Sequence, residues 1–240
     1  QPLTAANTRP VKVISRPDHY VGMTTYTGNN TVGATIPHGL GVAPAVIIFK
    51  RREANNEKWS TYHHKNTSAP ETDHLELNDS SATSDDDSIL NDTAPSSTLI
   101  TMKTSDSVNA NSIKYVAYCF SEIKGYSKHG SYTGNGNADG AYVHLGFRPA
   151  WILIKVTSTA NDWILLDNKR DSFNVATKKL NPNLNDAESN DSGVSTDFLS
   201  NGFKIRTAGG NVNQSSATFV YMAFAESPFV NSNGVPTNAR

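Results

Sequence analysis

The sequence predicts an all-β protein built from two tandem β-sandwich modules, and three observations lead to this prediction. Tyr26-Thr27-Gly28-Asn29 returns 106 residues later as Tyr132-Thr133-Gly134-Asn135. Short β-branched and aromatic runs are separated by clusters of Gly, Asn, Asp, Ser and Pro, which is the pattern of strands and turns. Helical periodicity is scarce. A repeat of about one hundred residues has the size of a small domain, so we expect each copy to bury its own core.

Further landmarks recur in the same order. The run GVAPAVIIFK, which ends at Lys50, returns as GFRPAWILIK, which ends at Lys155, and Trp59 returns as Trp163. The separations of these pairs are 105 and 104 residues. We therefore predict a tandem duplication, with the boundary between the modules near 125–128. The expected division is an extended arm at 1–20, module 1 at 21–125 and module 2 at 126–240.

The strands are expected where apolar and β-branched residues gather. In module 1 they are 21–27, 45–51, 58–64, 74–78, 98–103 and 113–123. In module 2 they are 130–133, 150–156, 162–167, 177–180, 203–207 and 218–226. From Tyr115 to Glu122 both alternating faces are apolar, which predicts a central strand covered on both sides. Cys119 lies in this run, and we interpret it as a small buried hydrophobe.

Four segments fall outside this strand pattern. Residues 1–20 contain three prolines and have no counterpart in module 2, so we expect an extended arm. The polar connections 78–97 and 181–201 are expected to be surface loops. The tail 231–240 contains Gly234 and Pro236 and is expected to be irregular.

Composition excludes several classes of function. The 240 residues carry 21 Lys and Arg against 22 Asp and Glu, a formal net charge of -1, which disfavours binding to nucleic acid through its backbone charge. No apolar run approaches the roughly 20 residues of a membrane span, so we expect no membrane insertion. The single cysteine excludes an internal disulfide and a cysteine-based zinc cluster.

One acidic motif raises the question of catalysis. Glu71, Asp73 and Glu76 have the E-x-D-x-x-E spacing found on one strand of some β-sandwich glycoside hydrolases. Retaining glycosidases need two carboxyl groups about 5 to 5.5 Å apart, which strand spacing can supply. However, Pro70 removes a ladder donor just before the motif, and the matching region of module 2 has no acid. We favour a solvated loop or edge strand over a catalytic site.

Two further clusters raise the question of a metal. His63 and His64 are adjacent, so on a strand they point to opposite faces and cannot easily share one ion, even with His74 nearby. The run 85–87 is all Asp, but it lacks the spacing and the closing Glu of an EF-hand. We predict no catalytic residues, no metal and no cofactor.

Aromatic residues beside turns are the remaining candidates for binding. Tyr26, Tyr132 and Tyr142 lie next to glycine-rich turns, where exposed rings stack on sugars. We name Tyr26 and Tyr132 as candidate ligand-binding residues, together with the polar loops 78–97 and 186–196. The alternative is that each ring folds back onto its own sheet as part of the scaffold.

Long stretches of the chain resemble a known type of module. They include GYSKHGSYTGNGNADGAYVHLGFRPAWILIKVTSTANDWILLDNKRD, FVYMAFAESPFVNSNGVPTNAR and, in module 1, IPHGLGVAPAVIIFK. These are similar to a repeated module in tail-fibre and other virion structural proteins of marine bacteriophages. The resemblance implies β-sandwiches of lectin-like or glucanase-like shape, and it brings no catalytic residues with it.

We therefore expect a non-enzymatic virion structural protein on the exterior of a phage particle, as a tail-fibre or exposed appendage component that contacts the host surface. Its expected partners are further copies of itself in a homotrimer, other virion proteins, and a glycan or protein of the host surface. A first alternative is a capsid decoration or head-fibre protein. A second is a glycan-degrading enzyme that uses Glu71, Asp73 and Glu76.

Overall fold

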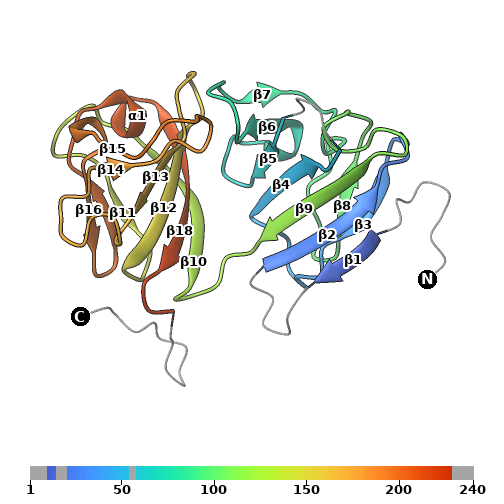
Figure 1. Cartoon of the computed structure of the whole chain (residues 1–240), viewed down its shortest axis with the longest axis horizontal. Helices are drawn as coiled ribbons and strands as arrows, with labels where there is room; N and C mark the ends of the chain where they lie inside the picture. Colours follow the sequence, from blue (N-terminus) through green and yellow to red (C-terminus); the bar gives the residue numbers. More distant parts are fainter. Residues whose placement is uncertain (1–9, 15–20, 54–57, 229–240) are drawn as a thin grey trace. The chain divides into compact units, whose positions relative to one another are not determined.

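The computed structural model describes residues 10–14, 21–53 and 58–228, and it is dominated by antiparallel strands (Figure 1). Every strand pairing in this part of the chain is antiparallel. Helical structure there is limited to α1 (Gly210–Asn213), η1 (Pro70–Thr72) and η2 (Ser192–Val194). The predicted all-β class is confirmed.

The contacts divide the chain into two compact units, which we describe separately. Unit 1 comprises Gln1–Asn78 and Thr83–Ser121. Unit 2 comprises Asp79–Ala82 and Glu122–Arg240. The names unit 1 and unit 2 are used below in this sense.

Unit 1 contains a seven-stranded sheet in the order β1-β2-β9-β4-β5-β6-β7 and a two-stranded sheet, β3-β8. The strands are β1 (Pro10–Ile14), β2 (Val21–Thr27), β3 (Ala34–Pro37), β4 (Val46–Arg51), β5 (Ser60–His63), β6 (Asp73–Glu76), β7 (Ser84–Asp85), β8 (Leu99–Met102) and β9 (Lys114–Phe120). The core draws on both sheets: Phe49 and Ala117 come from the large sheet, Ile36 and Ile100 from the small one. As predicted, β9 is central, with β2 and β4 on either side.

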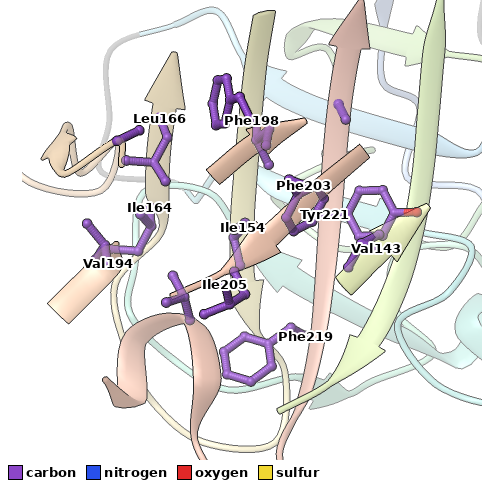
Figure 2. Packing of buried hydrophobic residues seen from close by; sticks show 14 of the residues in the cluster. Val143, Ile154, Ile164, Leu166, Val194, Phe198, Phe203, Ile205, Phe219 and Tyr221 are labelled. Carbon is purple, nitrogen blue, oxygen red and sulfur yellow. The ribbon is translucent and has the colours of Figure 1, made fainter. Parts of the chain in front are cut away.

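Unit 2 contains a four-stranded sheet, β10-β18-β12-β13, a three-stranded sheet, β11-β17-β16, and the pair β14-β15. The strands are β10 (Ser127–Thr133), β11 (Tyr142–His144), β12 (Pro149–Val156), β13 (Ile164–Asp167), β14 (Lys178–Lys179), β15 (Ser189–Asn190), β16 (Thr196–Leu199), β17 (Gly202–Ile205) and β18 (Thr218–Ala225). Figure 2 shows how side chains of both larger sheets gather in one core, with Ile154 and Phe219 from one and Phe203 and Ile205 from the other.

The structure corrects several sequence-based predictions. Residues 10–14 of the expected arm form β1, an edge strand that pairs with β2, because strand pairing needs only backbone groups on a free sheet edge. The other residues of the arm that lie at 1–9 and 15–20, and the expected tail 231–240, are outside the described residues. The short strands β3, β11 and β16 were not predicted.

The two polar loops are also less exposed than expected. In unit 1, Ile89 and Leu90 turn inward from the loop 78–97 and are 3% and 1% exposed. In unit 2, Val194 and Thr196 of the loop 186–196 are fully buried. Part of each loop is therefore packed into the core of its unit, and most of the rest faces solvent.

Candidate ligand-binding site

Tyr26, the first candidate contact residue, lies in the core and not on the surface. Its side chain is 1% exposed, and its ring stacks on that of Tyr115, with centroids 5.3 Å apart. The hydroxyl donates a hydrogen bond to the carbonyl oxygen of Val108 at 2.7 Å. Burial raises the pKa of this phenol well above its usual value, with smaller effects from Tyr115 and Cys119. The predicted exposure of Tyr26 is wrong, because its strand directs the ring inward.

Tyr132 holds the corresponding place in unit 2. Its hydroxyl donates to the carbonyl oxygen of Val212 at 2.7 Å, and its ring stacks on Phe219 with centroids 5.0 Å apart. The ring is half-buried, and burial raises the pKa of its phenol well above the usual value. The face and hydroxyl that a ligand would use are already engaged. Of the three tyrosines beside turns, Tyr142 is the exposed one, at 46%.

A buried asparagine in each unit, missed by the sequence analysis, holds the loops beside these tyrosines. Asn109 is fully buried; its Nδ2 donates to the carbonyl oxygens of Lys103 at 2.7 Å and Thr31 at 3.1 Å. Its Oδ1 accepts from the amide of Asn29 at 2.9 Å. One side chain thus ties together three separate backbone segments of unit 1. We call this arrangement the asparagine clamp.

Unit 2 contains the same clamp around Asn213, which is also fully buried. Its Nδ2 donates to the carbonyl oxygens of Thr207 at 2.7 Å and Asn137 at 2.8 Å. Its Oδ1 accepts from the amide of Asn135 at 2.9 Å. The signal that would have revealed both residues is the dipeptide Val108-Asn109, which recurs as Val212-Asn213 at the separation of the tryptophan landmarks.

The backbone around the clamps also follows one pattern. The amide of Gly28 donates to Ile113 and that of Gly134 to Ala217, at 2.8 and 2.9 Å. A Cβ on Gly28 would lie 2.2 Å from the carbonyl oxygen of Ala110, and one on Gly134 would lie 2.3 Å from that of Gln214. Close approach of two backbones therefore requires glycine at both positions. The glycine-rich turns seen in the sequence serve this packing.

The three acidic residues of the hydrolase-like motif have separate surroundings. Glu71 belongs to η1, whereas Asp73 and Glu76 belong to β6 and, three positions apart, point to opposite faces. Asp73 accepts a hydrogen bond from the hydroxyl of Thr67. Glu76 pairs with the ammonium of Lys58 at 2.6 Å. Asp73 and Glu76 therefore each have a partner of their own and lie on opposite faces of β6.

The metal candidates also have other partners. His63 Nδ1 accepts from the amide of Lys65 at 3.1 Å. Asp86 accepts from the amide and hydroxyl of Ser88, and Asp87 pairs with Lys103. In the part of the chain that the structure describes, no group of three or more His, Cys, Asp or Glu residues could hold a metal ion. No described helix is long and apolar enough to cross a membrane.

Unit 2 contains one fully buried lysine. The Lys155 ammonium donates to the carbonyl oxygens of Asn161 at 2.8 Å and Ser80 at 3.1 Å. Burial lowers the pKa of this ammonium to about 8, against the opposing attraction of Asp162 and Asp79. Ser80 also accepts from the amide of Asn161 at 2.7 Å, so the lysine completes a small polar cluster.

A cavity of about 490 Å³ in unit 2 is the strongest candidate for a ligand site. Its volume falls in the range of small-molecule pockets, roughly 300–1,000 Å³. One wall is the tight turn 122–128, in which the amides of Tyr126 and Ser127 donate to the carbonyl oxygen of Ile123. The other wall is the segment 144–147, where the amides of Leu145 and Gly146 donate to Asn201. Both walls are therefore fixed by backbone hydrogen bonds.

The lining combines cationic and apolar groups. Lys124 and Lys128 supply two ammonium groups, and the Lys128 ammonium is anchored by a 2.7 Å hydrogen bond to the carbonyl oxygen of His144. Glu122 is the acidic residue of the lining, and its carboxylate accepts from the amide of His129 at 2.9 Å. Leu145 and Phe147 also line the cavity, but at 6% and 2% exposure they belong mainly to the core of unit 2 and offer only a small apolar edge.

His144 and Gly146 shape the mouth of this cavity. His144 Nδ1 lies 3.3 Å from the hydroxyl of Tyr142, and its Nε2 lies 3.9 Å from where a Cβ on Gly146 would be. Apart from Gly146 itself and its chain neighbours Leu145 and Phe147, no other atom lies within 4 Å of that point. Gly146 has a φ of 83°, a conformation that favours glycine, so no side chain is expected in this place beside Nε2. The carbonyl oxygen of the same histidine accepts from Lys128, so His144 and Lys128 belong to one part of the lining.

Comparisons with known proteins give one match. A family model described as a domain of unknown function (DUF7483) matches residues 8–228. No curated protein and no solved structure matches the chain.

Proposed function

The chain belongs to the DUF7483 family, and from this starting point we propose that it is a non-enzymatic structural protein of a bacteriophage virion. It forms part of a tail fibre or another exposed appendage and contacts the host surface. The observation that carries its structural part is the asparagine clamp, which bonds equivalent backbone positions in both units. The resemblance of long stretches to virion modules of marine bacteriophages supports the same conclusion.

The proposal includes a tandem duplication of one lectin-like or glucanase-like β-sandwich module, at 21–125 and 126–240. Three kinds of equivalent contact support it. The tyrosine hydroxyls donate to Val108 and Val212, the clamp side chains bond the same backbone positions, and the close-packed glycines share one environment. The registers agree as well, since Tyr26 pairs with Tyr115 in β2-β9 and Tyr132 with Phe219 in β10-β18.

A structural role fits the way the polar groups are used. The buried asparagines and tyrosine hydroxyls bond backbone carbonyls, so they rigidify the scaffold and leave loops to make contacts. Two carboxylates of the hydrolase-like motif, Asp73 and Glu76, are engaged with Thr67 and Lys58. We therefore favour scaffold and binding over catalysis for this protein.

Self-association into a homotrimer is part of the proposal. Phe173, in a loop of unit 2, is 86% exposed, and Val175 and Leu184 are 42% and 43% exposed. Covering such apolar side chains between copies of the chain would favour association, because removal of apolar surface from water drives protein–protein contact. Repeated copies raise the avidity of weak host contacts, which suits a projecting appendage. Light scattering at micromolar concentration should give three times the monomer mass; a monomer would contradict this part.

The location is tested on purified particles of a phage whose genome encodes this chain. Mass spectrometry should detect the chain in the particles, and gold-labelled antibodies against it should mark the tail or its fibres. Labelling restricted to the capsid would favour a decoration or head-fibre protein instead. Absence of the chain from the particles would overturn the virion proposal.

A further inference from the structure

The cavity of unit 2 has features that point to a particular class of ligand. Its lining includes two lysines, Lys124 and Lys128, and one acidic residue, Glu122, whose carboxylate already accepts the amide hydrogen of His129. The Lys128 ammonium donates one of its three hydrogens to the carbonyl oxygen of His144. This bond fixes the ammonium beside a residue of the cavity wall and leaves two donors for a ligand. Such anchored donors favour an anionic group, since charge-assisted hydrogen bonds are the stronger kind.

The size and remaining lining require more than a bare ion. A cavity of about 490 Å³ greatly exceeds the space of one carboxylate or sulfate group. The edges of Leu145 and Phe147 in the lining offer limited apolar contact to C–H groups, and His144 Nε2, 3.9 Å from the place of a Cβ on Gly146, offers a hydrogen bond. The ligand should therefore carry an anionic group on a body with both apolar and hydroxylated faces.

An exposed aromatic ring stands next to this lining. Tyr142 and His144 lie two positions apart on β11 and point to the same side, with ring centroids 6.4 Å apart. The strand opposite presents Gly202 across from His144, so no side chain covers the histidine from that position. An exposed tyrosine beside polar groups is a common platform for the C–H face of a sugar ring.

Unit 1 lacks these features at the matching position. Gly22 pairs with Cys119 in β2-β9 as Lys128 pairs with Ala223 in β10-β18. A Cβ on Gly22 would lie 2.2 Å from the carbonyl oxygen of His38, so backbone occupies the path that the Lys128 side chain takes in unit 2. The scaffold does not require a lysine there, which indicates that Lys128 serves a purpose particular to unit 2.

We propose that this cavity binds a carboxylate-bearing monosaccharide unit of an acidic glycan. Lys128 and Lys124 bind the carboxylate, His144 Nε2 bonds a ring hydroxyl, and the apolar floor with the Tyr142 ring contacts the C–H faces. The cavity alone carries this assignment. A chain that binds no acidic sugar could still be a virion protein, and a chain that is absent from the virion could still bind one.

The test is an NMR titration of the full chain, labelled with ¹⁵N, with sodium glucuronate and in parallel with glucose. Glucuronate should shift the amide signals of Gly125, Lys128 and Gly146 with a Kd near about 1 mM, typical of a weak single-site ligand. Glucose should bind at least about tenfold more weakly, because it lacks the charge. Equal binding of both sugars, or shifts only outside the cavity, would overturn the proposal.

Variants separate the site from general charge effects. Lys128→Gln should weaken glucuronate binding about tenfold, which is the loss of one charge-assisted hydrogen bond. Lys169→Gln removes the same charge from an exposed position of unit 2 outside the lining and should change nothing. If Lys128→Gln lowers the melting temperature, Lys124→Gln, at an exposed position, replaces it. Equal affinities in the lining variants and the control would refute the site.

Discussion

Changing the clamp residue Asn213 to Asp tests the scaffold with almost no change of shape. The substitution replaces Nδ2, a donor to the carbonyl oxygens of Thr207 and Asn137, by an oxygen that only accepts. Two partly buried carbonyl groups then lose their donor, which costs about 1–3 kcal/mol for each group that is fully buried. We expect unit 2 to lose about 3 kcal/mol of unfolding free energy, in the lower half of the summed range of about 2–6 kcal/mol, because both carbonyls are only partly buried.

The assay is urea unfolding of the full chain at neutral pH, followed by fluorescence and circular dichroism. Asn213→Asp should move the transition of unit 2 to lower urea and leave that of unit 1 in place. Asn109→Asp should do the reverse and at a similar cost, because its Nδ2 also donates to two backbone carbonyl oxygens, those of Lys103 and Thr31. Asn201→Asp is the matched control, since Asn201 is exposed and bonds only through its backbone. If Asn213→Asp unfolds like this control, the clamp does not support the scaffold.

Three further outcomes follow from the buried groups. In the folded chain the Lys155 ammonium has a pKa of about 8, so it loses its proton at a lower pH than the same lysine in the unfolded chain. The free energy of unfolding of the wild type should therefore rise by about 2 kcal/mol from about pH 7 to about pH 9.5. Lys155→Met should abolish this rise in a pH series of melting curves, and a rise that persists in the variant would contradict the assignment. Tyr26→Phe and Tyr132→Phe should each cost about 1–2 kcal/mol, measured by urea unfolding, because each removes the donor to a buried carbonyl; exposed contact tyrosines would cost nothing. The Cys119 thiol is fully buried and its pKa is raised, so a thiol reagent should modify it only after denaturation, and fast labelling of the folded chain would refute its burial.

The strands with continuous apolar sequence could be predicted. β9 follows from a run that is apolar on both faces, and β2, β4 and β12 follow from β-branched residues bounded by turns. The short strands β3 and β11 could not, because three or four residues carry too little periodicity to separate a strand from a loop. Their positions depend on pairing with β8 and β17, far away in the sequence.

The candidate site was only partly predictable. Tyr26 and Tyr132 drew attention because they repeat beside glycines, yet the repetition reflects a shared core position. Tyr142, also beside a glycine-rich turn, is exposed as that argument expected. Lys128 could not be found from sequence, because its role depends on a turn and a strand end that meet only in the fold. The clamp asparagines were hidden among many exposed asparagines.

The most direct test that both units contain the same scaffold is hydrogen exchange of individual amides. The amides of Gly28 and Gly134 donate to equivalent carbonyls, as do those of Asn29 and Asn135 to the two clamps. Measured by NMR on the full chain, each pair should be protected relative to exposed loop amides. Protection of Gly28 and Asn29 with free exchange of Gly134 and Asn135, or the reverse, would contradict the account.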